Sequence, residues 1–134
     1  MIGVIVAGHG NLASEMITIA ENIMGKQNHL IATSVKSGES QDILVERLSE
    51  ILKNMETEDI IILSDIFGGS ISNTCLYFAK KRKHVGVVTG VNLPMILKVL
   101  THRDRKNLKE LVSEACEGGK HGIQDICGLL NINN

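Results

Sequence analysis

The residue with the clearest chemical potential in this sequence is His9, which lies between two glycines at the end of a short apolar run. Asp65 occupies the equivalent place after the most apolar run of the chain. A carboxylate that accepts the Nδ1 proton of an imidazole fixes its tautomer and leaves a lone pair on Nε2. Such a nitrogen is a good nucleophile near neutral pH. His9 and Asp65 are therefore predicted to form a nucleophile and its orienting acid.

A glycine-rich turn follows Asp65 and supplies the third part of the predicted site. Gly68, Gly69 and Ser70 precede a helical pattern, which predicts that their backbone N–H groups lie at a helix N-terminus, where phosphate oxygens bind. Transfer of a phosphoryl group to His9 fits these parts. Plainer interpretations stay open for each part alone, namely a histidine bonded to backbone, a helix-capping aspartate and a tight turn. Only their joint placement favours phosphoryl transfer.

Short strands that alternate with amphipathic helices are needed to position these residues, and the chain has that pattern. Strands are predicted over residues 1–7, 30–35, 59–64 and 84–89. Helices are predicted over residues 12–24 and from about residues 40, 70, 93 and 107. This order predicts an α/β fold, an open, mainly parallel sheet of about four strands with helices on both faces, as one domain over residues 1–134. Ligands of such sheets bind beyond the carboxyl ends of the strands, where His9 and Asp65 fall.

The C-terminal part of the chain gives a weaker pattern. Gly118 and Gly119 are expected to weaken the last long helix. The tail beyond Asp125 is expected either to add a short antiparallel edge strand or to fray. His102, Arg103 and Arg105 are interpreted as a surface patch for a partner.

Composition excludes several classes of function. A hydrophobic content of 43% with 22% charged residues is typical of a soluble globular domain. The net charge of -1 argues against a nucleic-acid partner, and the one short basic run, residues 80–83, suits the end of a helix. Three cysteines without metal-ligand spacing indicate free thiols in a reducing, cytoplasmic compartment. We expect no metal and no cofactor, because the standard nucleotide and metal motifs are absent from the sequence.

Three separated blocks of the sequence resemble a known family. They are residues 5–10 (IVAGHG), 63–70 (LSDIFGGS) and 90–95 (GVNLPM), and the match runs through most of the chain. In these blocks the chain resembles enzyme IIA of the mannose family of the bacterial phosphoenolpyruvate:sugar phosphotransferase system. One departure is Ile71, which stands where family members often have proline after the serine of the glycine-rich turn.

The resemblance implies a path for the phosphoryl group. The phosphocarrier HPr would phosphorylate His9 on Nε2, while Asp65 holds the Nδ1 side. The group would pass to a IIB protein on a separate chain, which phosphorylates sugar entering through IIC and IID membrane subunits. Family members are dimers that exchange a C-terminal edge strand, so a homodimer is expected. Apolar residues near the predicted site are candidates for docking or for core: Leu12, Phe67, Ile71 and Leu93.

Three other functions stay open at this point. The chain also looks related to the phosphotransfer subunit of a dihydroxyacetone kinase system, which uses a histidine near its N-terminus. A regulatory module would be phosphorylated on His9 without passing the group on. A non-catalytic binder of a small anion would use the same cleft without phosphorylation. The blocks at residues 67–70 and 90–95 favour the sugar system over the dihydroxyacetone system.

Overall fold

A computed structural model describes residues 1–65 and 69–132 of the chain. Its strands are β1 (Gly3–His9), β2 (Leu30–Val35), β3 (Ile60–Ser64) and β4 (Val85–Thr89). Its helices are α1 (Leu12–Met24), α2 (Gln41–Asn54), α3 (Ser70–Lys81), α4 (Leu93–His102), α5 (Leu108–His121) and α6 (Ile126–Leu129).

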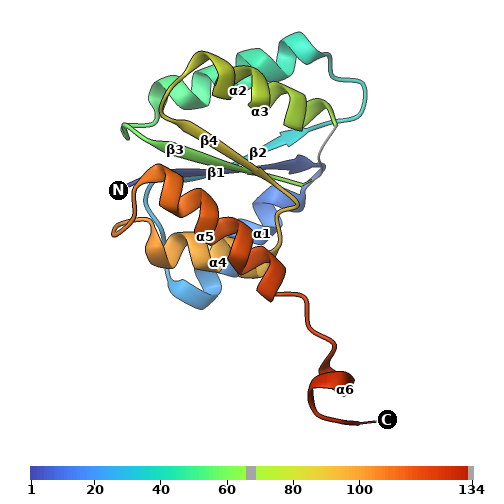
Figure 1. Ribbon diagram of the computed structural model, residues 1–134. Coiled ribbons are helices and arrows are strands. Elements are labelled where there is room, and N and C mark those ends of the chain that lie inside the picture. Colours follow the sequence, from blue (N-terminus) through green and yellow to red (C-terminus); the bar gives the residue numbers. More distant parts are fainter. Residues whose placement is uncertain (66–68, 133–134) are drawn as a thin grey trace.

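The strands form one parallel sheet in the order β2-β1-β3-β4. Helices α2 and α3 cover one face of the sheet, and α1, α4 and α5 cover the other (Figure 1). The predicted α/β class, with an open parallel sheet and helices on both faces, is confirmed. Because the strands share one direction, their carboxyl ends meet at one edge of the sheet, which is where ligands bind in such folds.

The core lies in two apolar clusters, one on each face of the sheet. Successive side chains of β1 alternate between them, so Val4 and Val6 pack with α1, α4 and α5, while Ile5 and Ala7 pack with α2 and α3. The central strands are therefore apolar at almost every position, as strands buried on both faces must be. This explains the continuous apolar runs in the sequence.

Side-chain caps determine where three of the helices begin. The Ser40 hydroxyl accepts a hydrogen bond from the first turn of α2, and the Asn92 side chain accepts one from the first turn of α4. Asn107 and Glu110 form a reciprocal capping box at the start of α5, with bonds of 2.8 and 3.1 Å. Each of these starts agrees with the sequence prediction.

Arg103 differs from its expected surface role. Only 2% of the residue is exposed, and its guanidinium donates hydrogen bonds to the backbone carbonyls of Ile2 and Asn28, at 3.3 and 2.7 Å. Further donors reach the His29 carbonyl and the Gln27 side chain. The side chain therefore joins the end of α4 to the starts of β1 and β2. The interpretation of Arg103 as part of a partner patch is wrong, because its guanidinium is buried and donates hydrogen bonds to backbone carbonyls that are distant in sequence.

The C-terminal tail leaves the end of α5 and extends away from the rest of the protein (Figure 1). It forms the single turn α6, where the Asp125 side chain accepts from the Gly128 N–H at 3.1 Å. The tail was expected either to form an antiparallel edge strand or to fray. In the described residues it forms a helical turn instead of a strand. A strand needs a ladder partner, and none of the tail residues up to 132 pairs with a strand of its own chain. Across residues 1–65 and 69–132, no helix is long and apolar enough to cross a membrane.

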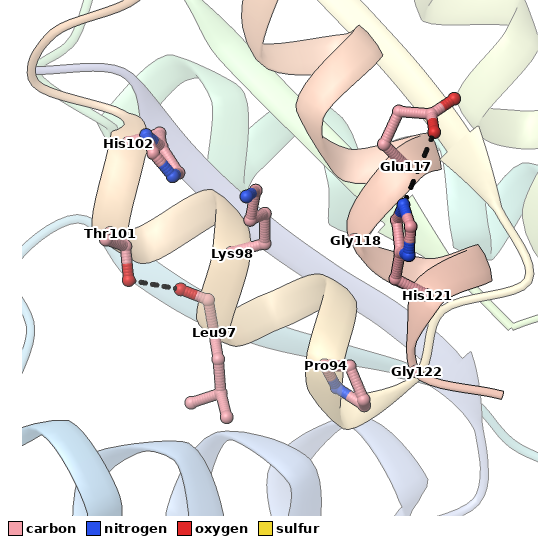
Figure 2. Close-up of a pocket in the computed structure, with 9 residues that line it drawn as sticks. All are labelled: Pro94, Leu97, Lys98, Thr101, His102, Glu117, Gly118, His121 and Gly122. Carbon is pink, nitrogen blue, oxygen red and sulfur yellow. Dashed lines mark hydrogen bonds and ion pairs between the residues drawn. The ribbon is translucent and has the colours of Figure 1, made fainter. Parts of the chain in front are cut away.

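Helix α5 continues through the two glycines that were expected to weaken it. Their small size lets α5 lie close to α4, as Figure 2 shows along the groove of about 490 Å³ between the two helices. A Cβ on Gly118 would lie 2.6 Å from the Cβ of Lys98, and one on Gly119 would lie 2.8 Å from Met95 Cε. The helix packing therefore offsets the poor helix propensity of glycine.

We predict that Gly118→Ala lowers the free energy of unfolding by about 1–3 kcal/mol relative to Gly119→Ala. Both changes gain the same helix propensity, but the new Cβ at position 118 meets the Cβ of Lys98, which is attached directly to the α4 backbone. At position 119 it meets Met95 Cε, the mobile end of a flexible side chain. Urea unfolding measures both values. Equal stabilities for the two variants would contradict the close-packing explanation.

Candidate functional site

The pairing of β1 with β3 brings the two predicted catalytic residues together. His9 is the last residue of β1, and Asp65 follows the last residue of β3. Ala7 is in register with Ser64, and the Asp65 N–H donates to the Ala7 carbonyl at 3.1 Å. The two side chains therefore start from neighbouring points on the same edge of the sheet.

A single carboxylate oxygen holds both the ring and the backbone of His9. The distance from His9 Nδ1 to Asp65 Oδ2 is 2.6 Å, and the His9 backbone N–H donates to the same oxygen at 2.9 Å. An ionised carboxylate only accepts hydrogen bonds, so Nδ1 must be the donor in this contact. In the neutral imidazole the lone pair is then on Nε2. The structure thus places the side chains of His9 and Asp65 in contact, and their catalytic roles stay predictions.

The two partners differ in exposure in a way that suits transfer chemistry. The side chain of His9 is 50% exposed, whereas that of Asp65 is 11% exposed. A buried carboxylate is held firmly and is shielded from water, which strengthens its hydrogen bonds. The exposed imidazole stays within reach of a reacting group on another molecule.

The predicted anion cradle lies only partly within the described residues. Gly69 is the N-cap of α3 and Ser70 is its first residue, and the helix ladder begins with the Asn73 N–H donating to the Gly69 carbonyl at 3.0 Å. The positive end of the α3 dipole is therefore at Gly69 and Ser70, a setting that favours an anion. Gly68 lies outside the described residues.

Other residues near the site belong either to the surface or to the core. Gly10 has a φ of +59°, which lets the chain turn from β1 into α1, and its N–H donates to the Val35 carbonyl at 3.1 Å. Leu12 is exposed, whereas Ile71 is buried and belongs to the core. Leu93 is half-buried against the core. Phe67 lies outside the described residues.

The turn between β2 and α2 is held by an ion pair that the sequence analysis missed. Arg47 forms hydrogen bonds with both carboxylate oxygens of Glu39 and donates to the Ser34 carbonyl at 2.6 Å. The bond from Arg47, followed by one from the Lys36 N–H, lowers the pKa of Glu39 to about 2. The pair fixes the turn that follows Val35, the residue in register with His9. No sequence motif marks it.

A second histidine–carboxylate pair lies at the opposite edge of the sheet and was also missed. His84 Nδ1 is 2.8 Å from Asp59 Oδ1, and its Nε2 is 4.0 Å from Glu58 Oε1. These residues come just before β4 and β3, so their proximity follows from strand pairing alone. In the part of the chain that the structure describes, no three His, Cys, Asp or Glu side chains gather as a metal site.

The chain resembles known proteins both in sequence and in fold. The family model described as PTS system fructose IIA component (EIIA-man) matches residues 3–116. The fructose-specific EIIA component of Bacillus subtilis (strain 168) is 35% identical over 84% of this chain and 78% of its own length. The mannose-specific EIIAB component of Escherichia coli (strain K12) is 30% identical over 92% of this chain, which spans 39% of that longer protein.

Solved structures agree with the fold. The EIIA component from Streptococcus agalactiae superposes with a TM-score of 0.88, covering 96% of this chain and 99% of that one, at 23% identity. The IIA protein of a fucose utilization operon from Streptococcus pneumoniae gives a TM-score of 0.78 at 28% identity, with 96% of each chain covered.

Together, the family model and the curated relatives identify a phosphocarrier component of the phosphotransferase system (PTS) for sugar uptake, and the parallel α/β fold agrees with them. Within that system, the chain belongs to the mannose family of IIA components. The matches favour this function over the dihydroxyacetone kinase subunit, the regulatory module and the anion-binding module.

We predict that Asp65 determines the tautomer of His9. In the wild type at a pH where the ring is neutral, the proton is expected on Nδ1, and Asp65→Ala is expected to shift it toward Nε2 because the acceptor is lost. Long-range ¹⁵N–¹H correlation spectra distinguish the two tautomers. His84 is the internal control, since Asp59 still holds its Nδ1. A His9 tautomer that does not change in the variant would contradict the inferred orienting role.

Proposed function

We propose that this chain accepts a phosphoryl group from phospho-HPr on Nε2 of His9 and passes it to a IIB component. The observation that supports this most is the 2.6 Å contact between His9 Nδ1 and Asp65, which assigns the free lone pair to Nε2. In the uptake step, Nε2 attacks the phosphorus and a P–Nε2 bond forms, while the P–N bond to the donor histidine breaks. The Nδ1 proton stays on His9, and its bond to Asp65 stabilises the positive charge that develops on the ring.

The remaining predicted site residues are proposed to hold the phosphoryl oxygens. Gly68, Gly69 and Ser70 would supply backbone N–H groups at the positive end of α3. The supporting observation is that α3 begins at Ser70 on the same edge of the sheet as His9. Such a site positions a phosphoryl group and stabilises its charge, which phosphoryl transfer needs more than covalent machinery.

The proposed partners follow from this role. HPr is the donor and a IIB component is the acceptor, with IIC and IID subunits acting in the membrane beyond IIB, while this chain acts in the cytoplasm as a single IIA domain over residues 1–134. The curated relatives are named for fructose, mannose and sorbose, and we propose a hexose as the transported sugar.

We further propose that two copies of the chain form a dimer through their C-terminal tails. Four large apolar side chains of the tail are 60–78% exposed, so their own chain leaves them uncovered. A second copy is the partner that covers equivalent surfaces in a symmetric assembly. The residues concerned are Ile123, Ile126, Leu129 and Leu130.

Incubation with phosphoenolpyruvate, enzyme I and HPr is predicted to add one phosphoryl group to the wild type and none to His9→Ala. The added group should be lost in acid, because a P–N bond is acid-labile. Intact mass measures the gain and its loss. An acid-stable gain would assign the group to a hydroxyl such as Ser70, and no gain with HPr itself phosphorylated would refute the proposed function.

Asp65→Ala is predicted to lower the rate of phosphoryl uptake about ten- to a hundredfold, because the ring of His9 loses the group that orients it. Stopped reactions with phospho-HPr, followed by mass, give the rate. Circular dichroism and urea unfolding of the same sample check that the fold is intact. A rate equal to that of the wild type would remove Asp65 from the mechanism.

A further inference from the structure

A buried threonine in the first half of α3 bonds to the residue that begins the helix. The Thr74 hydroxyl donates to the Ser70 carbonyl at 2.9 Å, and Thr74 is fully buried. The oxygen of the same hydroxyl accepts a hydrogen bond from the side-chain amide of Gln41, the first residue of α2. A relay of two hydrogen bonds therefore joins the start of α2 to the start of α3. We call it the Gln41–Thr74 relay.

Other bonds fix the start of α2, from which the relay begins. The Ser40 hydroxyl caps the helix by accepting from the Ile43 N–H. The residue before it, Glu39, is bonded through its carboxylate to Arg47 of the same helix. Helices α2 and α3 lie beside each other on one face of the sheet (Figure 1). The capped start of α2 thus holds Gln41 in place, and Gln41 holds the Thr74 hydroxyl.

The relay ends on a peptide group in the first turn of α3. Resonance couples the C=O and N–H of one peptide group, and the Ser70 carbonyl shares its group with the Ile71 N–H. A hydrogen bond accepted by the carbonyl polarises the group, which makes its N–H a stronger donor. The first N–H groups of a helix are not used by its own ladder, so they are available to an anion. The Gly69 carbonyl accepts in the same way from the Ser72 hydroxyl, at 3.0 Å, and shares its peptide group with the Ser70 N–H.

Threonines on two other helices make the same local bond in a different setting. Thr18 on α1 and Thr101 on α4 each donate to the carbonyl four residues earlier, at 3.0 and 2.7 Å, but both are exposed. Water can replace a bond at the surface, whereas a buried hydroxyl needs partners from the protein. Thr74 is buried and has its second partner in Gln41. The relay therefore differs from an ordinary bond between a threonine and its own helix.

We propose that Thr74 and Gln41 are positioning residues for phosphoryl transfer, which fix the first turn of α3 and strengthen the Ile71 N–H as a donor to the phosphoryl oxygens. The inference rests on the proposed function, because the anion concerned is the phosphoryl group that His9 carries. The relay acts on the group that is transferred and not on the docking of the donor protein. Loss of the relay should therefore lower the maximal rate and leave the half-saturating donor concentration unchanged.

The first test measures uptake from phospho-HPr by the full chain. Thr74→Val removes the hydroxyl and keeps the shape of the side chain, and it is expected to lower the maximal rate by about three- to tenfold, less than the loss of a whole donor. Thr74→Ser keeps the hydroxyl and should react at nearly the wild-type rate. Gln41→Leu changes an exposed residue and should give a smaller loss without altering the core. Thr18→Val is the matched control, because it removes the same bond from an exposed site.

Amide ¹H–¹⁵N spectra give a second readout, which a change in stability alone would not move. Phosphorylation of the wild type is expected to shift the Ile71 amide proton downfield, because the N–H then donates to a charged oxygen. This shift should be smaller in Thr74→Val and kept in Thr74→Ser. Urea unfolding of each variant checks that the fold is intact.

A lower maximal rate in Thr74→Val and Gln41→Leu, with a smaller Ile71 shift and wild-type behaviour of Thr74→Ser and Thr18→Val, would support the relay. A wild-type rate in Thr74→Val would overturn it. An equal loss of rate in Thr18→Val, or an Ile71 amide that does not respond when the wild type is phosphorylated, would overturn it too. Failure of the proposed function is distinct, because the wild type itself would then take no phosphoryl group from phospho-HPr.

Discussion

The contact on which the rest of the site depends is the hydrogen bond between His9 and Asp65. The two lie 56 positions apart in the sequence, and the parallel pairing of β1 with β3 brings them together. Parallel neighbours need a long crossover, and the segment from α1 to α2 with β2 provides it. The architecture between the two residues thus serves to bring one imidazole and one carboxylate into contact.

A carrier must hold its reacting group in place and yet leave it within reach of other molecules. In the proposed roles of His9 and Asp65, the two demands fall on different residues. Asp65 is largely buried and bonds to both the ring and the backbone of His9, so it fixes the position of the ring. The imidazole itself is half exposed. The buried carboxylate of Asp65 therefore orients the imidazole, while the imidazole of His9 stays accessible to other molecules. The same residue does not have to be both buried and exposed.

The sequence predicted those features that are encoded locally. Alternating apolar patterns indicated the strands and helices, and Asn107 with Glu110 marked the start of α5 through a spacing of three residues. Arg103 was misassigned because its acceptors lie in segments more than 70 residues away. Gly118 was expected to weaken its helix because of its low helix propensity. Its close approach to Lys98 on α4 is a tertiary contact, which the local sequence does not indicate. The joining of His9 with Asp65 was predictable because strand ends meet at one edge in a parallel sheet.

The two histidine–carboxylate pairs show that the pair alone does not define a phosphoryl site. His84 and Asp59 have nearly the same geometry as His9 and Asp65, but they lie at the amino edge of the sheet, where α3 ends rather than begins. The carbonyl end of a helix dipole repels an anion, and the Glu58 carboxylate 4.0 Å from Nε2 of His84 adds further negative charge. At the carboxyl edge, α3 presents its positive end at Ser70 instead. The direction of the strands therefore favours an anion at the edge that carries His9.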